Sequence, residues 1–150
     1  MALNFDTSGQ LKAPFGMKYD QQGRVIILAR AHDTLVAGTP YRIKVDEYGY
    51  FTAAPAANQV DTYRVGIAKK AYVADAIAEL VHGGPYSGMI TVSLSVSVGH
   101  SFGITAGAVV DNTVDYDDAM DNSFGVCYTA SSESTTQDVV MVPELMTAAS

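Results

Sequence analysis

The sequence predicts an all-β protein built from two related β units, with an extended arm before them. Three features carry this prediction: short runs of alternating or β-branched apolar residues, turn residues between these runs, and one residue pattern that occurs twice. The chain has 150 residues, the size of one domain. We expect residues 1–23 to form the arm and residues 24–150 to form a single β domain, with pseudo-repeats over about 35–84 and 96–143.

The repeated pattern is a glycine, two small or turn residues, an aromatic residue, a spacer and an isoleucine. The two copies read Gly38-Thr39-Pro40-Tyr41-Arg42-Ile43 and Gly99-His100-Ser101-Phe102-Gly103-Ile104. A second glycine follows 28 residues later in the first copy (Gly66) and 26 residues later in the second (Gly125). Two copies of one β unit indicate a duplicated scaffold.

The predicted strands follow one another along the whole chain after the arm. They cover residues 24–29, 41–45, 50–52, 63–68, 89–98, 104–110, 124–130 and 138–142. The clearest is 89–98, where Val92, Leu94 and Val96 alternate with serines. Such alternation is typical of an antiparallel strand with one face in the core.

Residues 71–82 carry two competing patterns. Val73, Ile77 and Leu80 have helical spacing, and His82-Gly83-Gly84 resembles the end of a helix. The matching segment of the second copy, residues 139–143, is strand-like. We therefore favour a strand from Ile77 to His82, and the fold contains at most one short helix.

The composition limits the function classes. Residues 1–70 carry nine basic and six acidic residues, whereas residues 71–150 carry ten acidic and no basic ones. The basic half can meet an acidic partner, or the halves can interleave so that the asymmetry averages out. We expect no nucleic-acid binding, since no basic cluster exceeds the pair Lys69-Lys70. No apolar run approaches the roughly 20 residues that span a membrane.

Hydrophobic residues make up 48% of the chain and charged residues only 17%. Apolar surface in excess of what one core needs is typically used in an interface, so we expect oligomerisation or docking. The N-terminus has no signal-peptide pattern, and the chain has a single cysteine, Cys127. The single cysteine, together with the lack of an Asn-x-Ser/Thr sequon, fits synthesis in a reducing cytoplasm. Cys127 stands where the first copy has Ala68, which predicts a small buried strand residue.

Several motifs resemble catalytic or metal sites without the context that these sites need. The segment Gly99-His100-Ser101-Phe102-Gly103 matches a nucleophile elbow, but no helix pattern follows it and no histidine comes later in the chain. The acidic residues 111–121 lack the spacing of an EF-hand, which favours a solvated loop. His32 and His82 have no cysteine or paired carboxylate at ligand spacing. We expect no catalytic, cofactor-binding or metal-binding residue.

The glycine-aromatic pattern, followed by Val65-Gly66-Ile67-Ala68 and by a strand that ends at His82-Gly83-Gly84, resembles the capsid decoration, or cement, proteins of tailed bacteriophages. The resemblance covers residues 35 to about 142, and its motifs are short. The second copy departs from the family pattern, because Ser101 replaces the proline and Cys127 replaces the usual alanine. The resemblance implies a small β-barrel or β-tulip domain.

The resemblance also implies a function and partners. The protein would lie on the outer capsid surface of the virion, commonly as a homotrimer, and would clamp neighbouring major capsid protein subunits of the expanded head. The arm would supply the contacts, since an extended segment can add a strand to an exposed sheet edge. The expected contact residues are the apolar Phe5, Leu11, Phe15 and Met17, with Lys12 and Lys18 pairing with acidic capsid groups.

Two other classes of function remain open from the sequence. One is a ligand- or glycan-binding β module that uses Tyr48, Tyr50, Tyr86 and Tyr116 as stacking platforms. The other is a different virion subunit, such as a tail-tube or head-completion protein. An enzyme is the least supported class, and no cofactor is expected.

Overall fold

The computed structural model describes residues 16–45, 51–55, 64–105, 107–111, 123–129 and 131–142. These residues form ten strands and no helix, which confirms the all-β prediction. The strands are β1 (Met17–Tyr19), β2 (Val25–Ala31), β3 (Pro40–Val45), β4 (Phe51–Pro55), β5 (Val65–Ala68), β6 (Ile77–Val96), β7 (Ser101–Thr105), β8 (Ala108–Asp111), β9 (Gly125–Thr129) and β10 (Ser131–Met141). Ile77 to His82 is a strand, as predicted. Within the described residues there is accordingly no helix that could span a membrane.

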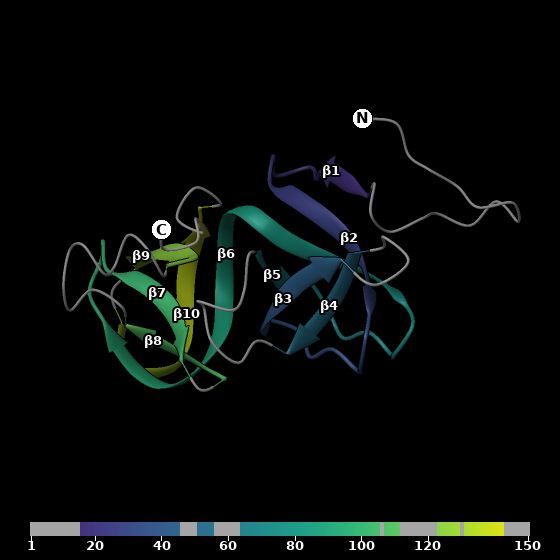
Figure 1. Cartoon of the computed structure of the whole chain (residues 1–150). Helices are drawn as coiled ribbons and strands as arrows, with labels where there is room; N and C mark the ends of the chain where they lie inside the picture. The colour runs from purple at the N-terminus through teal and green to yellow at the C-terminus, as the bar shows by residue number, and fades with distance from the viewer. Residues whose placement is uncertain are drawn as a thin grey trace, which may run out of the picture.

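The first unit is a closed ring of strands. β2 and β4 form a parallel pair. The other four pairs are antiparallel: β4 with β3, β3 with β5, β5 with β6, and β6 with β2. Closing a sheet on itself satisfies the backbone groups that would otherwise remain at its edges. The first half of β6 completes this ring (Figure 1).

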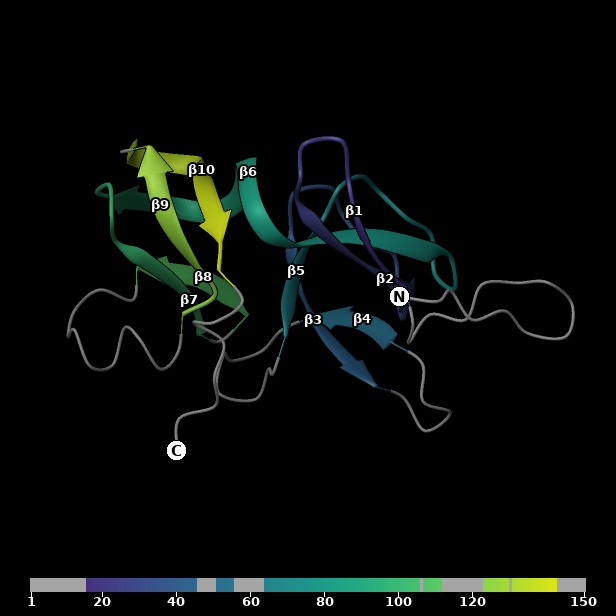
Figure 2. The same cartoon turned by 90° about the horizontal axis from the view of Figure 1, so that it is seen from above.

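The second unit repeats this arrangement on the second half of β6. There β6 pairs with β10, β10 with β9, β9 with β7, and β7 with β8. β8 also contacts β6, so this unit is curved toward closure. The two units lie side by side, and β6 runs from one into the other (Figure 2).

Matching hydrogen bonds show that the two units repeat the same backbone structure. The amide of Gly38 donates to the carbonyl of Ala68, and the amide of Gly99 donates to the carbonyl of Cys127, each at 2.9 Å. Both glycines have a positive φ, 81° and 88°, which a residue with a Cβ adopts at a cost. The duplicated β units predicted from the sequence are therefore present in the fold.

The second glycine of each pattern is required by close packing. Gly66 lies opposite Tyr41, and Gly125 lies opposite Phe102. A Cβ at Gly66 would lie 2.7 Å from the Cβ of Leu80, and one at Gly125 would lie 2.5 Å from the Cγ2 of Val139. Neither distance is tolerated, so only glycine allows these strands to approach.

Two clusters of buried side chains form the core. Each strand of the first ring contributes to one cluster, which therefore fills the ring; its members include Ile27, Ala29, Tyr41, Ile43, Ala53, Ala68, Ala78 and Leu80. The second cluster contains side chains of both units, because residues of β2, β5 and β6 pack against residues of the second unit. Its members include Ile26, Leu28, Val65, Ile67, Val81, Met89, Phe102, Phe124, Val139 and Met141. The two units thus share one continuous apolar contact.

The close packing at the second glycines leads to a stability prediction. Gly66→Ala and Gly125→Ala should each lower the free energy of unfolding by about 1–3 kcal/mol, because the added methyl group forces strands apart in a packed core. Cys127→Ala is the matched control, since the equivalent position of the first unit already holds alanine. It should cost less than either glycine variant in urea unfolding. Equal costs for all three would contradict the packing argument.

Candidate functional site

The hairpin of β1 and β2 carries the most elaborate polar structure among the described residues. Its turn is held by Asp20, whose Oδ1 accepts the backbone amides of Gln22 and Arg24 at 2.9 and 3.0 Å. Its Oδ2 accepts the Nε of Arg24 at 2.7 Å. The amide of Gly23, with φ at 76°, donates to the carbonyl of Asp20 at 3.0 Å. An aspartate that bonds its own turn fixes the hairpin locally.

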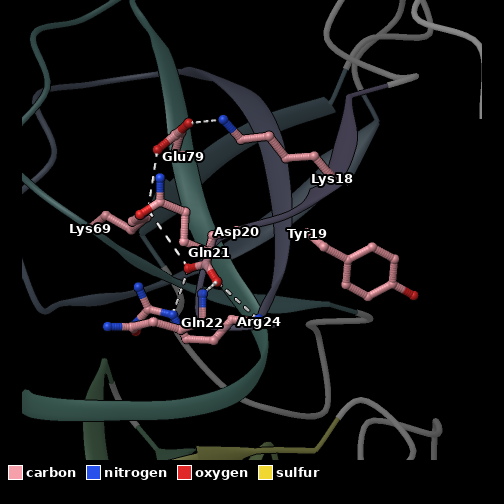
Figure 3. A pocket seen from close by; sticks show the side chains of 8 residues that line it. All are labelled: Lys18, Tyr19, Asp20, Gln21, Gln22, Arg24, Lys69 and Glu79. Carbon is pink, nitrogen blue, oxygen red and sulfur yellow. Dashed lines mark hydrogen bonds and ion pairs between the residues drawn. The ribbon is translucent and has the colours of Figure 1, made fainter.

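A second group of charges ties this hairpin to the rest of the ring. The Nζ of Lys18 donates to Oε1 of Glu79 on β6. The Nζ of Lys69 lies 3.4 Å from Oε2 of Glu79 and 3.8 Å from Oδ2 of Asp20. Figure 3 shows these side chains around a surface hollow of about 400 Å³. With Arg24, three cations surround two carboxylates; we call this set the hairpin ion cluster.

The cluster lowers the proton affinity of both carboxyl groups. Burial alone would raise the pKa of Asp20, but the hydrogen bonds from Arg24 and Gln22 outweigh it and hold that pKa below its ordinary value. At Glu79 the hydrogen bond from Lys18 is the main cause of a lowered pKa, and the charge of Lys69 adds to it. Both groups are therefore held as carboxylates.

The opposite face of β1 is apolar and exposed. Met17 is 41% exposed and Tyr19 is 77% exposed. Together with Val25 and the stem of Lys18 they line a shallow hollow of about 340 Å³. In Figure 3 the ring of Tyr19 points away from the hairpin ion cluster. One short strand thus presents charge on one face and an aromatic and a thioether side chain on the other.

Two of the six predicted contact residues belong to this hairpin. Met17 is exposed, as a contact residue must be, whereas Lys18 is already bonded to Glu79 within the chain. Phe5, Leu11, Lys12 and Phe15 lie outside the described residues. In the last part of the predicted arm, residues 17–19 pair with β2 of their own ring, and residues 20–23 form the turn between the two strands.

Sequence reasoning missed the partners in the hairpin ion cluster. The segment Asp20-Gln21-Gln22-Gly23 is a turn signal that could have been recognised. The approach of Lys69 and Glu79 could not, because it depends on how the ring closes. Ion pairs between residues so far apart in the sequence follow from topology alone.

The motifs that resemble catalytic sites have other roles in the structure. Ser101 is buried at the start of β7 and lies opposite Val126, so it is not on a strand-to-helix turn. Cys127 is buried, its Sγ lies 3.1 Å from the carbonyl of Thr129, and burial raises the pKa of its thiol. In the described part of the chain, no three metal-ligating side chains lie together.

The remaining predicted polar residues are distributed over both units. His82 is buried, with its Nδ1 2.9 Å from the carbonyl of Val65. His100 lies 2.8 Å from Asp111, the one residue of the acidic segment 111–121 that the structure describes. Tyr86 is half-buried with its hydroxyl directed at the carbonyl of Ala68, 3.4 Å away. Tyr48, Tyr50 and Tyr116 lie outside the described residues.

Among solved structures, the chain is similar to the N base of the head fiber gp8.5 of bacteriophage phi29. The TM-score is 0.53 with 15% sequence identity, and the match covers 79% of this chain and 93% of that chain. At this identity the likeness establishes a shared fold. No family model and no curated protein matches the chain.

The lowered pKa values of the hairpin carboxyls predict how stability depends on pH. A carboxyl whose folded pKa is lowered stabilises the fold fully above its unfolded pKa near 4, and this contribution is lost as the pH falls through the folded pKa. The melting temperature should therefore fall more between pH 5 and pH 3 in the natural protein than in Asp20→Asn or Glu79→Gln.

The control for this experiment is Asp33→Asn, an exposed carboxyl outside the hairpin ion cluster. Its profile should follow that of the natural protein. A profile of Asp20→Asn that is parallel to that of the natural protein over the same pH range would contradict the assignment.

Proposed function

We propose that this protein is a structural component of a bacteriophage head, bound to the outer surface of the capsid, where it stabilises the expanded shell. Its partners are the major capsid protein and further copies of itself, arranged as a trimer on the shell. The role is structural rather than catalytic and needs no cofactor, nucleic acid or membrane.

The observation that carries the proposal is the shared fold. The match covers 93% of the head-fiber base of phage phi29 and 79% of this chain, which is more than either β unit alone makes up. A fold alone does not determine function. Here the fold agrees with an independent indication, the resemblance of the sequence pattern to the decoration proteins of tailed phages.

The geometry is consistent with a passive binding role. A closed ring and a second, curved unit are joined through β6 and share an apolar cluster, and the exposed apolar side chains of the hairpin directly follow residues 1–15 in the sequence. In our proposal the arm residues Phe5, Leu11, Lys12 and Phe15 contact the capsid, whereas Met17 contacts a further copy of the protein. Lys18 joins them only by exchanging its bond to Glu79 for one to a capsid carboxylate.

The test is co-sedimentation of the purified protein with undecorated, expanded heads of the virus that encodes it. We expect saturable binding at a simple ratio to the capsid subunit. A variant that lacks residues 1–15 keeps the whole hairpin, and we expect it to bind at least about tenfold more weakly, a loss of about 1.4 kcal/mol. Circular dichroism spectra and melting temperatures show whether this variant is folded.

Two outcomes would count against the proposal. A folded full-length protein that remains in the supernatant would contradict capsid binding itself. A folded variant without residues 1–15 that binds as tightly as the full chain would leave capsid binding intact and remove the arm from the contact.

A further inference from the structure

The outer edge of β1 is open in the part of the chain that the structure describes. Among the described strands, β1 is the first in the sheet order and pairs with β2 alone. The amide of Asp20 bonds to the carbonyl of Arg24, and the amide of Leu28 to the carbonyl of Gly16. In an antiparallel ladder this places Lys18 and Ile26 in a hydrogen-bonded pair. The amides and carbonyls of Met17 and Tyr19 therefore point away from β2.

Lys18 does not protect this edge. Natural proteins place lysine on exposed edge strands because a charge there opposes pairing with another strand. Here the side chain of Lys18 reaches back over its own sheet to Glu79 on β6 (Figure 3). Its charge is balanced within the chain and lies on the side away from the open edge.

The side chains beside the open edge are apolar. Met17 and Tyr19 alternate with Lys18 along the strand, and they line the shallow hollow with Val25 and the stem of Lys18. Tyr19 is the most exposed of the large hydrophobic side chains that the structure describes. The hairpin ion cluster holds the turn that joins this edge strand to β2.

We propose that this edge pairs with the same edge of a second copy, antiparallel and centred on Lys18. Met17 of each copy then lies opposite the partner's Tyr19, and their outward amides and carbonyls exchange hydrogen bonds. The methionine packs on the partner's tyrosine ring, a contact that is favourable for sulfur. The pairing is self-complementary, as a two-fold interface must be, so it joins copies of neighbouring trimers and not copies within one trimer.

The charges at this edge allow a second copy as the occupant. Two lysines opposite each other would repel, but each Lys18 is neutralised by its own Glu79. A contact of three residues per chain buries far less than the roughly 1,200 Å² of a stable interface, so it is weak in solution. Its population rises with concentration, and covalent trapping can detect it.

The register makes the test specific. In a hydrogen-bonded antiparallel pair the Cα atoms of opposed residues are about 5.5 Å apart, within disulfide range. Two Met17 residues would be roughly 8.5 Å apart, beyond the limit of about 7 Å. In a Cys127→Ala background, Met17→Cys mixed with Tyr19→Cys should form a mixed disulfide dimer in glutathione buffer. Either variant alone should form at least about fivefold less dimer.

Two further variants separate edge pairing from random collision. Val98→Cys mixed with Met17→Cys is the control, since Val98 is 60% exposed on the second unit. The other variant carries both Met17→Pro and Tyr19→Cys, and it is mixed with the Met17→Cys protein. Its proline removes an outward amide and leaves the hydrogen bonds to β2 in place. It should abolish the mixed dimer and leave the melting temperature nearly unchanged. Trapping no greater than in the Val98 control would overturn the proposal.

A photoreactive benzoylphenylalanine in place of Tyr19 identifies whatever occupies the edge. Mass spectrometry of the irradiated protein should find the crosslink on residues 17–25 of a second copy. A crosslink to residues 1–15 of the same chain would assign the edge to the chain's own N-terminus and overturn the proposal. A crosslink only to capsid protein, on decorated heads, would assign the edge to the shell and also overturn it.

Discussion

The continuity of β6 is the constraint on which the rest of the structure depends. This strand of 20 residues closes the first ring against β2 and then forms the base of the second unit against β10. Gly84 and Gly88, both with positive φ, lie where it passes from one unit to the other. Because a single strand takes part in both hydrogen-bond ladders, neither unit can move without disturbing the other.

The sequence predicted the repeated elements well because they depend on local chemistry. The glycines at 38, 66, 99 and 125 mark positions where a turn or a close approach excludes a side chain, and the structure uses each of them in this way. The continuity of β6 through residues 83–88, which joins its first half to its second, was not predicted. His82-Gly83-Gly84 resembles a stop, yet the strand continues, because β10 takes up pairing from Gly84 onward.

The candidate site could be predicted only in part, because only some of its contacts depend on local chemistry. The exposure of Met17 could be predicted, because this apolar residue lies in a segment that is rich in turn residues. The bond of Lys18 to Glu79 depends on the distance across β2, which is fixed by ring closure. This bond changes the interpretation of Lys18. The sequence alone presents its charge as available to a partner, whereas in the structure Glu79 neutralises it. The neighbouring edge of β1 is then left without a net charge.

The two units share what the backbone requires and differ in what a partner would recognise. The register makes Arg42 and Lys44 on β3 equivalent to Gly103 and Thr105 on β7, and makes Lys69 equivalent to Tyr128. No basic residue occurs after Lys70 in the sequence. Electrostatic contacts are strong only at short range in physiological salt. A partner with an acidic surface therefore meets complementary charge on the first unit alone, and a duplicated fold here carries two unlike surfaces.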